Sequence, residues 1–190
     1  KVNVPEVNTY GLLQALEFYS KSSSNNFIFF STGSVYGSKL KKPNENDKPS
    51  PENYYGYTKL IGEKLCHYYS KKYNKPFVIL RPFYIYGKNQ KSKLFYEIKD
   101  KIIKNKKIKL AQGIGMKFNA CYVEDVALIV KSFLKSKNDK FSIYNLASNE
   151  TLYLNNIVSL IAQKLNKKYQ IDSHQAEIKI NVCDNKKINK

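Results

Sequence analysis

The stretch Phe27-Ile28-Phe29-Phe30 is a short, unbroken apolar run, and Phe77-Val78-Ile79-Leu80-Arg81 is a second one further along the chain. Apolar runs of this length are typical of strands that are covered on both faces, as in a parallel sheet. Residues 53–73 between them begin with Asn53, a good helix cap, and place apolar residues at helical spacing. Strand, helix and strand in this order predict a right-handed crossover unit.

The segments on either side continue this alternation, which predicts an α/β fold with a doubly wound parallel sheet. We predict further helices at residues 4–20, 92–104, 126–134 and 154–165, and further strands at residues 108–110, 120–123, 141–146 and 177–182. The predicted buried face of the helix at 53–73 consists of Tyr57, Leu60, Ile61, Leu65, Tyr68 and Tyr69. Gly113-Ile114-Gly115 predicts a turn, and Glu124 and Asp125 favour a helix start.

The composition favours a soluble globular protein. Hydrophobic residues make up 42% of the 190 residues, and no apolar run approaches the ~20 residues of a membrane span. The first ten residues lack the apolar core of a signal peptide, so we expect a cytoplasmic protein without a membrane partner. Cys66, Cys121 and Cys183 are odd in number and unlike a metal-binding pattern, so we expect free, at least partly buried thiols and no metal site.

The formal charge of +18 is compatible with a nucleic-acid partner. The lysines are spread over nearly every segment, however, and Arg81 is the only arginine, although arginine supplies the fork that binds phosphates and bases. A solvated basic surface is therefore favoured over a basic RNA-binding module, which stays as an alternative. A positive field would also suit a small phosphate-bearing ligand.

Three Tyr-x-x-x-Lys pairs occur, at Tyr55/Lys59, Tyr68/Lys72 and Tyr84/Lys88. The abundance of tyrosine and lysine gives about three such pairs by chance, so the spacing alone carries little weight. Tyr55 differs from the other two tyrosines because it stands at a predicted helix start, downstream of a strand that ends in hydroxyl and glycine residues. One helical turn away, the Lys59 ammonium can act on the Tyr55 phenol, whose free pKa near 10 otherwise makes it a poor base at neutral pH.

Ligands of parallel sheets gather at the carboxyl ends of the strands, which here means Thr32 and residues 82–87. Residues 32–53 contain Pro43, Pro49 and Pro51 and are predicted to form a long loop over the end of the first strand. A loop of this length inside a compact domain is more often functional than not. The sequence therefore predicts a site where Thr32, Tyr55 and Lys59 meet.

Several motifs occur in one order along the chain. Ser31-Thr32-Gly33-Ser34-Val35-Tyr36-Gly37 is followed by Tyr55-Gly56-Tyr57-Thr58-Lys59 and by Arg81-Pro82-Phe83-Tyr84-Ile85-Tyr86-Gly87. Similar matches are found at residues 9–15, 122–127 and 144–147. The ordered set resembles the extended short-chain dehydrogenase/reductases, specifically the NAD-dependent sugar-nucleotide epimerase/dehydratase family. The resemblance is collinear across nearly the whole chain and implies a Rossmann-like sheet with a small substrate-binding α/β portion.

The resemblance also implies roles for individual residues. Thr32 would orient a sugar hydroxyl, Tyr55 would take its proton, and Lys59 would bond the nicotinamide ribose of NAD or NADP. Cofactor contacts are implied for Ser31, Tyr55, Lys59 and Pro82, and nucleotide-sugar contacts for Gly33, Ser34, Tyr84 and Lys117. We expect residues 1–88 to form part of the nucleotide-binding domain and residues 89–190 a mixed substrate-binding portion. A homodimer through the helices at 4–20 and 53–73 is implied as well.

The departures from the family pattern narrow the prediction. The eight glycines form no dinucleotide fingerprint, so we expect a partial chain that lacks the first strands of the nucleotide-binding sheet and a C-terminal end. Tyr84 stands where the family commonly has asparagine, and Lys117 is one position short of its usual basic residue, which weakens the case for a standard uridine-diphosphate sugar. Gly33 and Ser34 replace the acidic pair of a 4,6-dehydratase. We predict an NAD(P)-dependent epimerase or ketoreductase, with a catalytically inactive Rossmann-like scaffold as the alternative.

Overall fold

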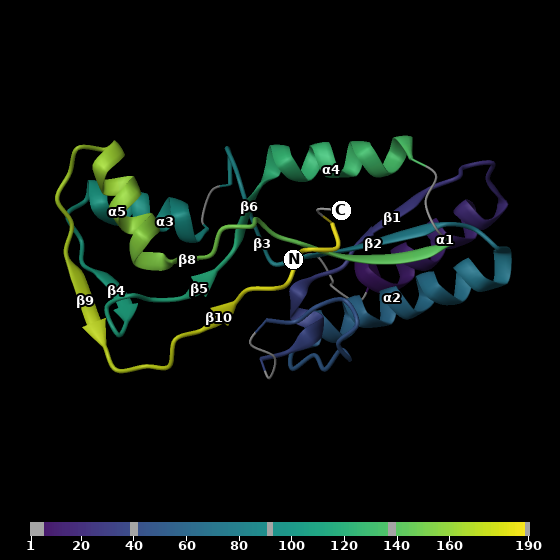
Figure 1. Cartoon of the computed structure of the whole chain (residues 1–190), viewed down its shortest axis with the longest axis horizontal. Helices are drawn as coiled ribbons and strands as arrows, with labels where there is room; N and C mark the ends of the chain where they lie inside the picture. Colours follow the sequence, from purple (N-terminus) through teal and green to yellow (C-terminus); the bar gives the residue numbers. More distant parts are fainter. Residues whose placement is uncertain (1–5, 39–41, 91–92, 137–139, 189–190) are drawn as a thin grey trace.

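The computed structural model of the chain describes residues 6–38, 42–90, 93–136 and 140–188. Its centre is a parallel sheet in the order β1-β2-β7, built from β1 (Phe27–Phe30), β2 (Phe77–Pro82) and β7 (Phe141–Leu146). Helices α1 (Leu12–Lys21) and α2 (Tyr54–Tyr73) cover one face of this sheet, and α4 (Val123–Lys135) lies over the other (Figure 1). The predicted α/β fold with a parallel sheet is confirmed.

The packing of α2 on the sheet differs from the prediction. Of the residues predicted to be buried, Tyr69 is, but Tyr57, Ile61 and Tyr68 are exposed. The buried face of α2 consists of Gly56, Thr58, Gly62, Glu63, Cys66, Tyr69 and Ser70. A Cβ at Gly62 would lie 2.6 Å from the ring of Phe29, so α2 approaches the sheet more closely than large side chains would allow. Small residues such as Gly62 therefore face the sheet, and Tyr57 and Tyr68 lie on the exposed face of the helix.

A hydrophobic core fills the space between this sheet and the two helices on its face. Its buried members are Leu12, Leu16, Tyr19, Phe29, Cys66, Tyr69, Phe77 and Ile79. On the opposite face, Val126 of α4 packs with Cys121 and Leu146. Cys66, Cys121 and Cys183 are all buried free thiols, which confirms that expectation.

A second hydrophobic cluster lies beside the central sheet (Figure 1). Its buried members are Ile98, Ile102, Ile108, Leu110, Phe118, Leu154, Val158 and Ala162. The helices of this region are α3 (Leu94–Ile103) and α5 (Leu154–Lys164), and its strands are β3 (Tyr84–Tyr86), β4 (Ile108–Ala111), β5 (Lys117–Phe118), β6 (Ala120–Tyr122), β8 (Leu152–Tyr153), β9 (Ile171–His174) and β10 (Ile180–Asn181). β3 pairs with β6 and β4 with β9, whereas β5 lies between β10 and β8. The division of the chain at residue 88 stays a prediction.

Most predicted elements are present with shifted ends. The helix predicted at 4–20 consists of a π-helical turn at Glu6–Gly11 followed by α1, and residues 4 and 5 lie outside the described residues, as does Ser92. α4 begins earlier than predicted, at Val123, so that both acidic residues lie in its first turn. Gly113 and Gly115 have φ of 72° and 71°, which confirms the predicted turn.

The prediction for the end of the chain is largely wrong. The strand predicted at 177–182 is reduced to Ile180–Asn181, and β9 at Ile171–His174 was not predicted. β9 pairs with β4 over four residues, and a single sequence cannot show which of two polar segments finds that partner. Within the described ranges, no helix is long and apolar enough to cross a membrane, and no group of three or more His, Cys, Asp or Glu could hold a metal ion.

Candidate active site

Thr32 follows the end of β1 and precedes the short helical turn η2 (Gly33–Tyr36). Its backbone is extended, with φ −162° and ψ 150°. Its Oγ1 accepts a hydrogen bond from the Ser34 backbone N–H at 3.2 Å and donates to Ser34 Oγ at 3.3 Å. Thr32 is therefore a buried hydroxyl at the carboxyl edge of the parallel sheet, the place where such sheets bind ligands.

Tyr55 and Lys59 stand one turn apart at the start of α2. Asn53 caps this helix, because its Oδ1 accepts a hydrogen bond from the Gly56 N–H at 2.8 Å, which confirms the predicted helix start. Lys59 Nζ lies 5.9 Å from the centroid of the Tyr55 ring and donates to the backbone oxygen of Phe30 at 2.9 Å. The Tyr55 side chain is 45% exposed, so it is open to a ligand.

Gly56 brings these two segments together. A Cβ at Gly56 would lie 2.8 Å from the backbone oxygen of Ser34 and 3.0 Å from Cβ of Pro51. A backbone oxygen cannot move aside cheaply, so glycine is what lets the first turn of α2 pack on the turn that follows Thr32. The helix that bears Tyr55 and Lys59 therefore lies directly against the segment of Thr32.

The protonation of this site follows from its partial burial. Burial raises the pKa of Tyr55 above its ordinary value and lowers the pKa of Lys59. Because its pKa is raised, Tyr55 is an uncharged phenol at neutral pH, one helical turn from the amine of Lys59. Such a pair can donate a proton directly, and it can accept one when the ammonium stabilises the phenolate. The catalytic roles of Thr32, Tyr55 and Lys59 stay predictions.

Three further predicted site residues lie close to Thr32. The Ser31 hydroxyl donates to Oε1 of Glu63 at 2.5 Å, so it is already used within the protein. Gly33 lies under the ring of Phe83, which a Cβ at Gly33 would approach within 2.9 Å. Pro82 ends β2, opposite Leu146 of β7, and is half-buried.

Tyr84 and Lys117, predicted to contact a nucleotide-sugar, lie in the region of the second cluster, on β3 and β5, and their substrate contacts stay predictions. The Tyr84 ring packs with Phe95 and Phe118, with centroids 5.3 Å and 5.4 Å away. Lys117 Nζ lies 5.4 Å from the centroid of the Tyr153 ring. The predicted site residues thus fall into two groups, one around Thr32 and Lys59 and one in the region of α3 and α5.

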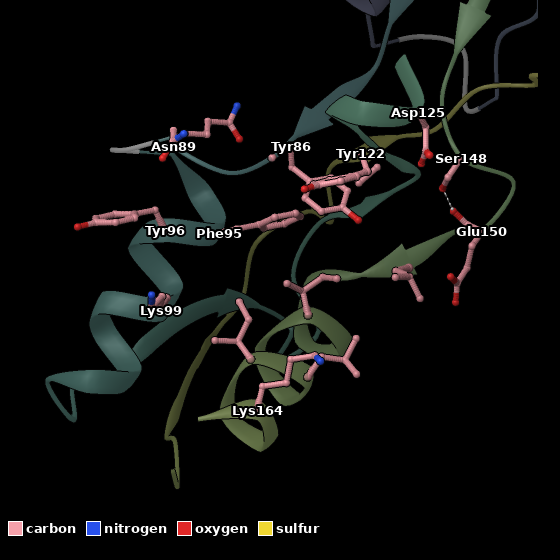
Figure 2. A pocket seen from close by; sticks show the side chains of 17 residues that line it. Tyr86, Asn89, Phe95, Tyr96, Lys99, Tyr122, Asp125, Ser148, Glu150 and Lys164 are labelled. Carbon is pink, nitrogen blue, oxygen red and sulfur yellow. Dashed lines mark hydrogen bonds between the residues drawn. The ribbon is translucent and has the colours of Figure 1, made fainter. Parts of the chain in front are cut away.

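A cavity of about 670 Å³ lies between α3, α5 and the ends of β3 and β6 (Figure 2). Its walls include Tyr86, Phe95 and Tyr122, with ring centroids 5.2 Å apart for Tyr86 and Phe95 and 5.4 Å apart for Tyr86 and Tyr122. Charged residues of both signs complete its lining: Lys99, Lys164, Asp125 and Glu150. Neither the group around Thr32 and Lys59 nor Tyr84 and Lys117 line this cavity.

The sequence pattern does not predict this cavity. One signal of it was present in the sequence. α5 carries more apolar residues than its core-facing side needs, such as Leu160, which is exposed. A second cavity, of about 650 Å³, runs along α1 and the π-helical turn before it, and reaches Phe29 and Lys59. Of these two cavities, the second reaches a residue of the predicted catalytic set, Lys59, and the first reaches none of them.

Comparisons with known proteins agree with the motif order. A sequence model described as the NAD dependent epimerase/dehydratase family matches residues 2–147. An uncharacterized UDP-glucose epimerase of Bacillus subtilis is 33% identical over 155 residues, which cover 81% of this chain and 49% of that protein. The N-acetyl-alpha-D-glucosaminyl-diphospho-ditrans,octacis-undecaprenol 4-epimerase of Escherichia coli O157:H7 is 30% identical, over 86% of this chain and 49% of that protein.

Solved structures show the same likeness. The UDP-glucuronic acid 4-epimerase of Bacillus cereus, in complex with UDP-glucuronic acid and NAD, has a TM-score of 0.85 and 27% identity, over 97% of this chain and 60% of that chain. The Thermus thermophilus UDP-glucose 4-epimerase, at 22% identity and a TM-score of 0.80, shares the fold. The chain spans about half the length of the two curated relatives above. On these matches and on its own motifs, the chain belongs to the NAD dependent epimerase/dehydratase family.

Proposed function

We propose that this chain carries the catalytic residues of an NAD-dependent enzyme that epimerises a nucleotide-linked sugar. The observation that carries the proposal is the packing of α2 on the Thr32 segment at Gly56, with Tyr55 exposed beside Lys59. It places a phenol, an ammonium and a hydroxyl at the carboxyl edge of a parallel sheet. The relatives named above, two epimerases by name and one 4-epimerase solved with NAD, support the same reaction class.

The donors at this edge fit the ribose of a dinucleotide. The Lys59 ammonium has three protons, one of which bonds the Phe30 oxygen, and the cavity along α1 reaches this side chain. NAD, when bound, supplies the acceptor for the hydride of the sugar carbon. The Lys59 charge stabilises the phenolate form of Tyr55, whose Oη accepts the proton of the sugar hydroxyl and so becomes a neutral phenol, while the Thr32 hydroxyl orients the sugar.

Phe83 argues against the 4,6-dehydratase reaction for this chain. An acidic side chain at position 33 would bring its Cβ within 2.9 Å of the Phe83 ring, so the ring would have to move before an acid could stand there. A ketoreductase needs no acid at this position and stays as the second candidate. The Thr32, Tyr55 and Lys59 set serves both reactions.

The reaction can be tested with the protein expressed from its complete gene. Incubation with NAD and, in parallel, UDP-glucose, UDP-glucuronic acid or UDP-N-acetylglucosamine is followed by proton NMR of the anomeric signals. We expect the 4-epimer of one of these sugars to appear without net formation of NADH. Net formation of NADH in place of epimer, with oxidation of a sugar hydroxyl to a ketone, would favour a ketoreductase running in its reverse direction. If none of these nucleotide-sugars gives an epimer or a net change in NADH, the proposal is contradicted. The catalytically inactive scaffold then remains.

We further propose that two copies of the chain associate through α1 and α2. Large apolar side chains stay exposed on both helices, among them Phe18 on α1 and Tyr57, Ile61 and Tyr68 on α2. Two adjacent helices with such side chains offer a second copy a matching apolar surface. Sedimentation of the wild type should give a dimer, and Phe18→Glu together with Tyr57→Glu should give a monomer. A monomeric wild type at tens of micromolar, on the order of ordinary dimer affinities, would exclude this interface.

A further inference from the structure

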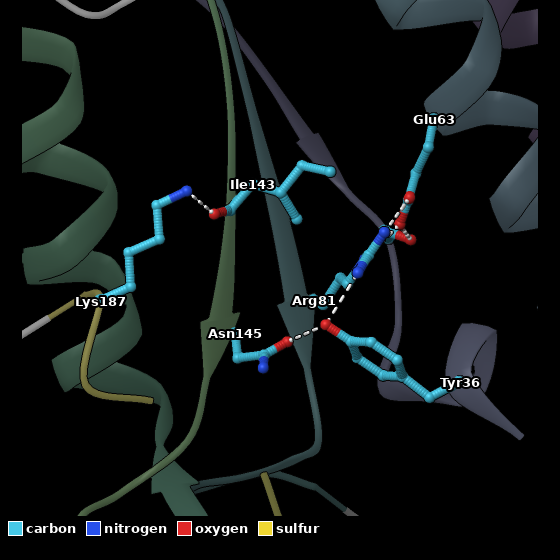
Figure 3. A network of polar contacts seen from close by, with 7 residues as sticks. Tyr36, Glu63, Arg81, Ile143, Asn145 and Lys187 are labelled. Atoms are coloured by element: carbon cyan, nitrogen blue, oxygen red, sulfur yellow. Dashed lines mark hydrogen bonds and ion pairs between the residues drawn. The ribbon is translucent and has the colours of Figure 1, made fainter. Parts of the chain in front are cut away.

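The single arginine of the sequence lies at the centre of a buried polar network (Figure 3). Arg81 on β2 is 2% exposed and Glu63 on α2 is 4% exposed. Arg81 donates from Nε to Glu63 Oε1 at 2.8 Å and from Nη2 to Glu63 Oε2 at 2.6 Å, which is the two-bonded geometry of a strong ion pair. Because Glu63 Oε1 also accepts the Ser31 hydroxyl, one carboxylate ties β1, β2 and α2 together.

The network continues from Arg81 to the third strand of the sheet. Arg81 Nη1 donates to the Tyr36 hydroxyl at 2.7 Å, and this hydroxyl donates to Asn145 Oδ1 of β7 at 2.9 Å. Asn145 Nδ2 in turn donates to the backbone oxygens of Pro43 and Asp184, at 3.2 Å and 2.9 Å. The Tyr36 hydroxyl is thus the link between the ion pair and the loop segments that pack over the end of the sheet.

A buried ion pair is weak evidence for stability, because removing two charges from water costs several kcal/mol that their attraction only partly offsets. Well-packed apolar residues of similar volume would often hold the same elements together at least as well. The pair is better explained by geometry, since a guanidinium and a carboxylate joined by two bonds fix both distance and direction. What they fix here is the position of α2 relative to the end of β1.

Two successive turns of α2 contact Phe30, the last residue of β1, and Ser31, the residue that follows it. Lys59 donates to the backbone oxygen of Phe30, and Glu63, one turn later, accepts the hydroxyl of Ser31. Thr32 is the next residue, and Tyr55 is one turn before Lys59 on the same helix. A shift of the Ser31 contact would therefore move Thr32, the Phe30 oxygen and the Lys59 ammonium relative to Tyr55.

We propose that Glu63 is a positioning residue for catalysis, held by Arg81 and the Tyr36 hydroxyl, and that it sets the placement of Thr32 and Lys59 relative to Tyr55. This inference rests on the proposed function, because it assigns Glu63 to the same site. The inference goes beyond the proposed function because it names residues that touch neither substrate nor cofactor. Misplacement of reacting groups by about 1 Å can cost on the order of 100-fold in rate, so the effect of losing the network should be measurable.

The experiment compares two variants, each of which removes the hydroxyl of one buried tyrosine. The two tyrosines lie at opposite ends of the sheet. Tyr36→Phe keeps the ring over the Arg81 guanidinium, 4.7 Å from ring centroid to Cζ, and removes the link to Asn145. Tyr19→Phe is the matched control, because Tyr19 is equally buried but its hydroxyl donates to the Pro76 oxygen, away from the site. Glu63→Gln removes the charge at nearly constant volume and is the stronger variant.

We expect Tyr36→Phe to lower kcat about 10-fold and Glu63→Gln about 100-fold, with KM for the nucleotide-sugar within about threefold of the wild type. Tyr19→Phe should stay within about twofold in kcat, although it lowers the melting temperature comparably. Equal kcat for Tyr36→Phe and Tyr19→Phe would overturn the inference and leave a merely structural network. If Glu63→Gln does not fold, the comparison of Tyr36→Phe with Tyr19→Phe still tests whether the network positions the catalytic residues.

A readout that needs no turnover separates this inference from the proposed function. Carbon-13 NMR of ring-labelled tyrosine follows the ionisation of Tyr55, whose signal is assigned by its loss in Tyr55→Phe. If the network positions Lys59, its charge moves away from Tyr55 in Tyr36→Phe, and the titration midpoint rises; Tyr19→Phe should leave it unchanged. A midpoint unchanged in Tyr36→Phe would contradict the inference even if the enzyme is active. A wild type without turnover would contradict the proposed function but would leave this test valid.

Discussion

The carboxyl edge of the β1-β2-β7 sheet and the cavity between α3 and α5 are built from different kinds of contact. At the sheet edge, Ser31, Glu63, Arg81 and Tyr36 are joined by hydrogen bonds of 2.5–2.8 Å. In the cavity, aromatic rings such as Tyr86 and Phe95 form the walls, and the charged residues of its lining are on separate helices and loops. The hydrogen-bonded sheet edge suits chemistry that depends on fixed geometry. The aromatic cavity suits contacts with a ligand to which its side chains can adjust.

The largest expected effect on stability comes from breaking the ion pair. Arg81→Met leaves Glu63 buried without its partner, so the free energy of unfolding should fall by about 3–5 kcal/mol. Urea unfolding measures this loss. The matched control is Lys104→Met, because Lys104, the residue that follows α3, forms an exposed ion pair with Asp100 at 2.9 Å, and solvent screens this pair so that its loss should hardly change the stability. Equal losses in the two variants would mean that the sheet edge is not the rigid region.

High pH should weaken the same edge through Tyr36. Burial raises the pKa of Tyr36 to about 12, against an ordinary value near 10 in the unfolded chain. The neutral phenol is therefore stabilised by folding, and this contribution is complete below pH 10 and is lost as the pH rises towards 12. The wild type should lose on the order of 2–3 kcal/mol more than Tyr36→Phe between pH 9 and pH 12, measured by urea unfolding. Parallel losses in the two proteins would show that Tyr36 is not held as a buried phenol.

Gly56→Ala tests the close contact between α2 and the Thr32 segment. Alanine is favoured over glycine within a helix by about 1 kcal/mol, but here its Cβ would meet the Ser34 oxygen at 2.8 Å. We expect a net loss of about 1–3 kcal/mol in unfolding free energy and a drop in turnover, because Tyr55 moves away from Thr32. A variant that is more stable than the wild type and equally active would show that the contact is not needed.

The smallest effect is expected at the cavity between α3 and α5. Lys164 is exposed in its lining, so Lys164→Ala should change the unfolding free energy by less than about 0.5 kcal/mol and turnover by less than about twofold. Steady-state kinetics and urea unfolding check both values. A KM for the nucleotide-sugar raised more than tenfold, on the order of one lost charged contact, would mean that this cavity takes part of the substrate and would bring the two regions into one site.

The sequence predicted the elements whose pattern is local. The strand at 27–30, the strand at 77–82 and the cap at Asn53 follow from apolar runs and side-chain chemistry that need no distant partner. The buried face of α2 was predicted only in part: Tyr69 is buried, but a glutamate in a helix is normally exposed, and the contacts of Glu63 with Arg81 and Ser31 have no local signal. That meeting depends on three segments that are far apart in the sequence.

The same reasoning applies to the residues of the candidate site. Thr32, Tyr55 and Lys59 could be proposed because a hydroxyl after a strand and a phenol at a helix start are local signals. Tyr84 and Lys117 were proposed from resemblance alone, and no local signal showed that the Tyr84 ring packs on Phe95 and Phe118. The aromatic cavity could not be foreseen, since it is formed by α3, α5 and two strand ends that only the tertiary fold brings together.

The central claim is that Tyr55 transfers the proton in an NAD-dependent reaction on a nucleotide-linked sugar. The most direct test is the turnover of Tyr55→Phe, in the protein expressed from its complete gene, with NAD and the sugar that the wild type converts. The hydroxyl of Tyr55 belongs to a 45% exposed side chain, so its removal should leave the fold and NAD binding intact while kcat falls about 10²–10⁴-fold. Turnover within a few-fold of the wild type would contradict the account.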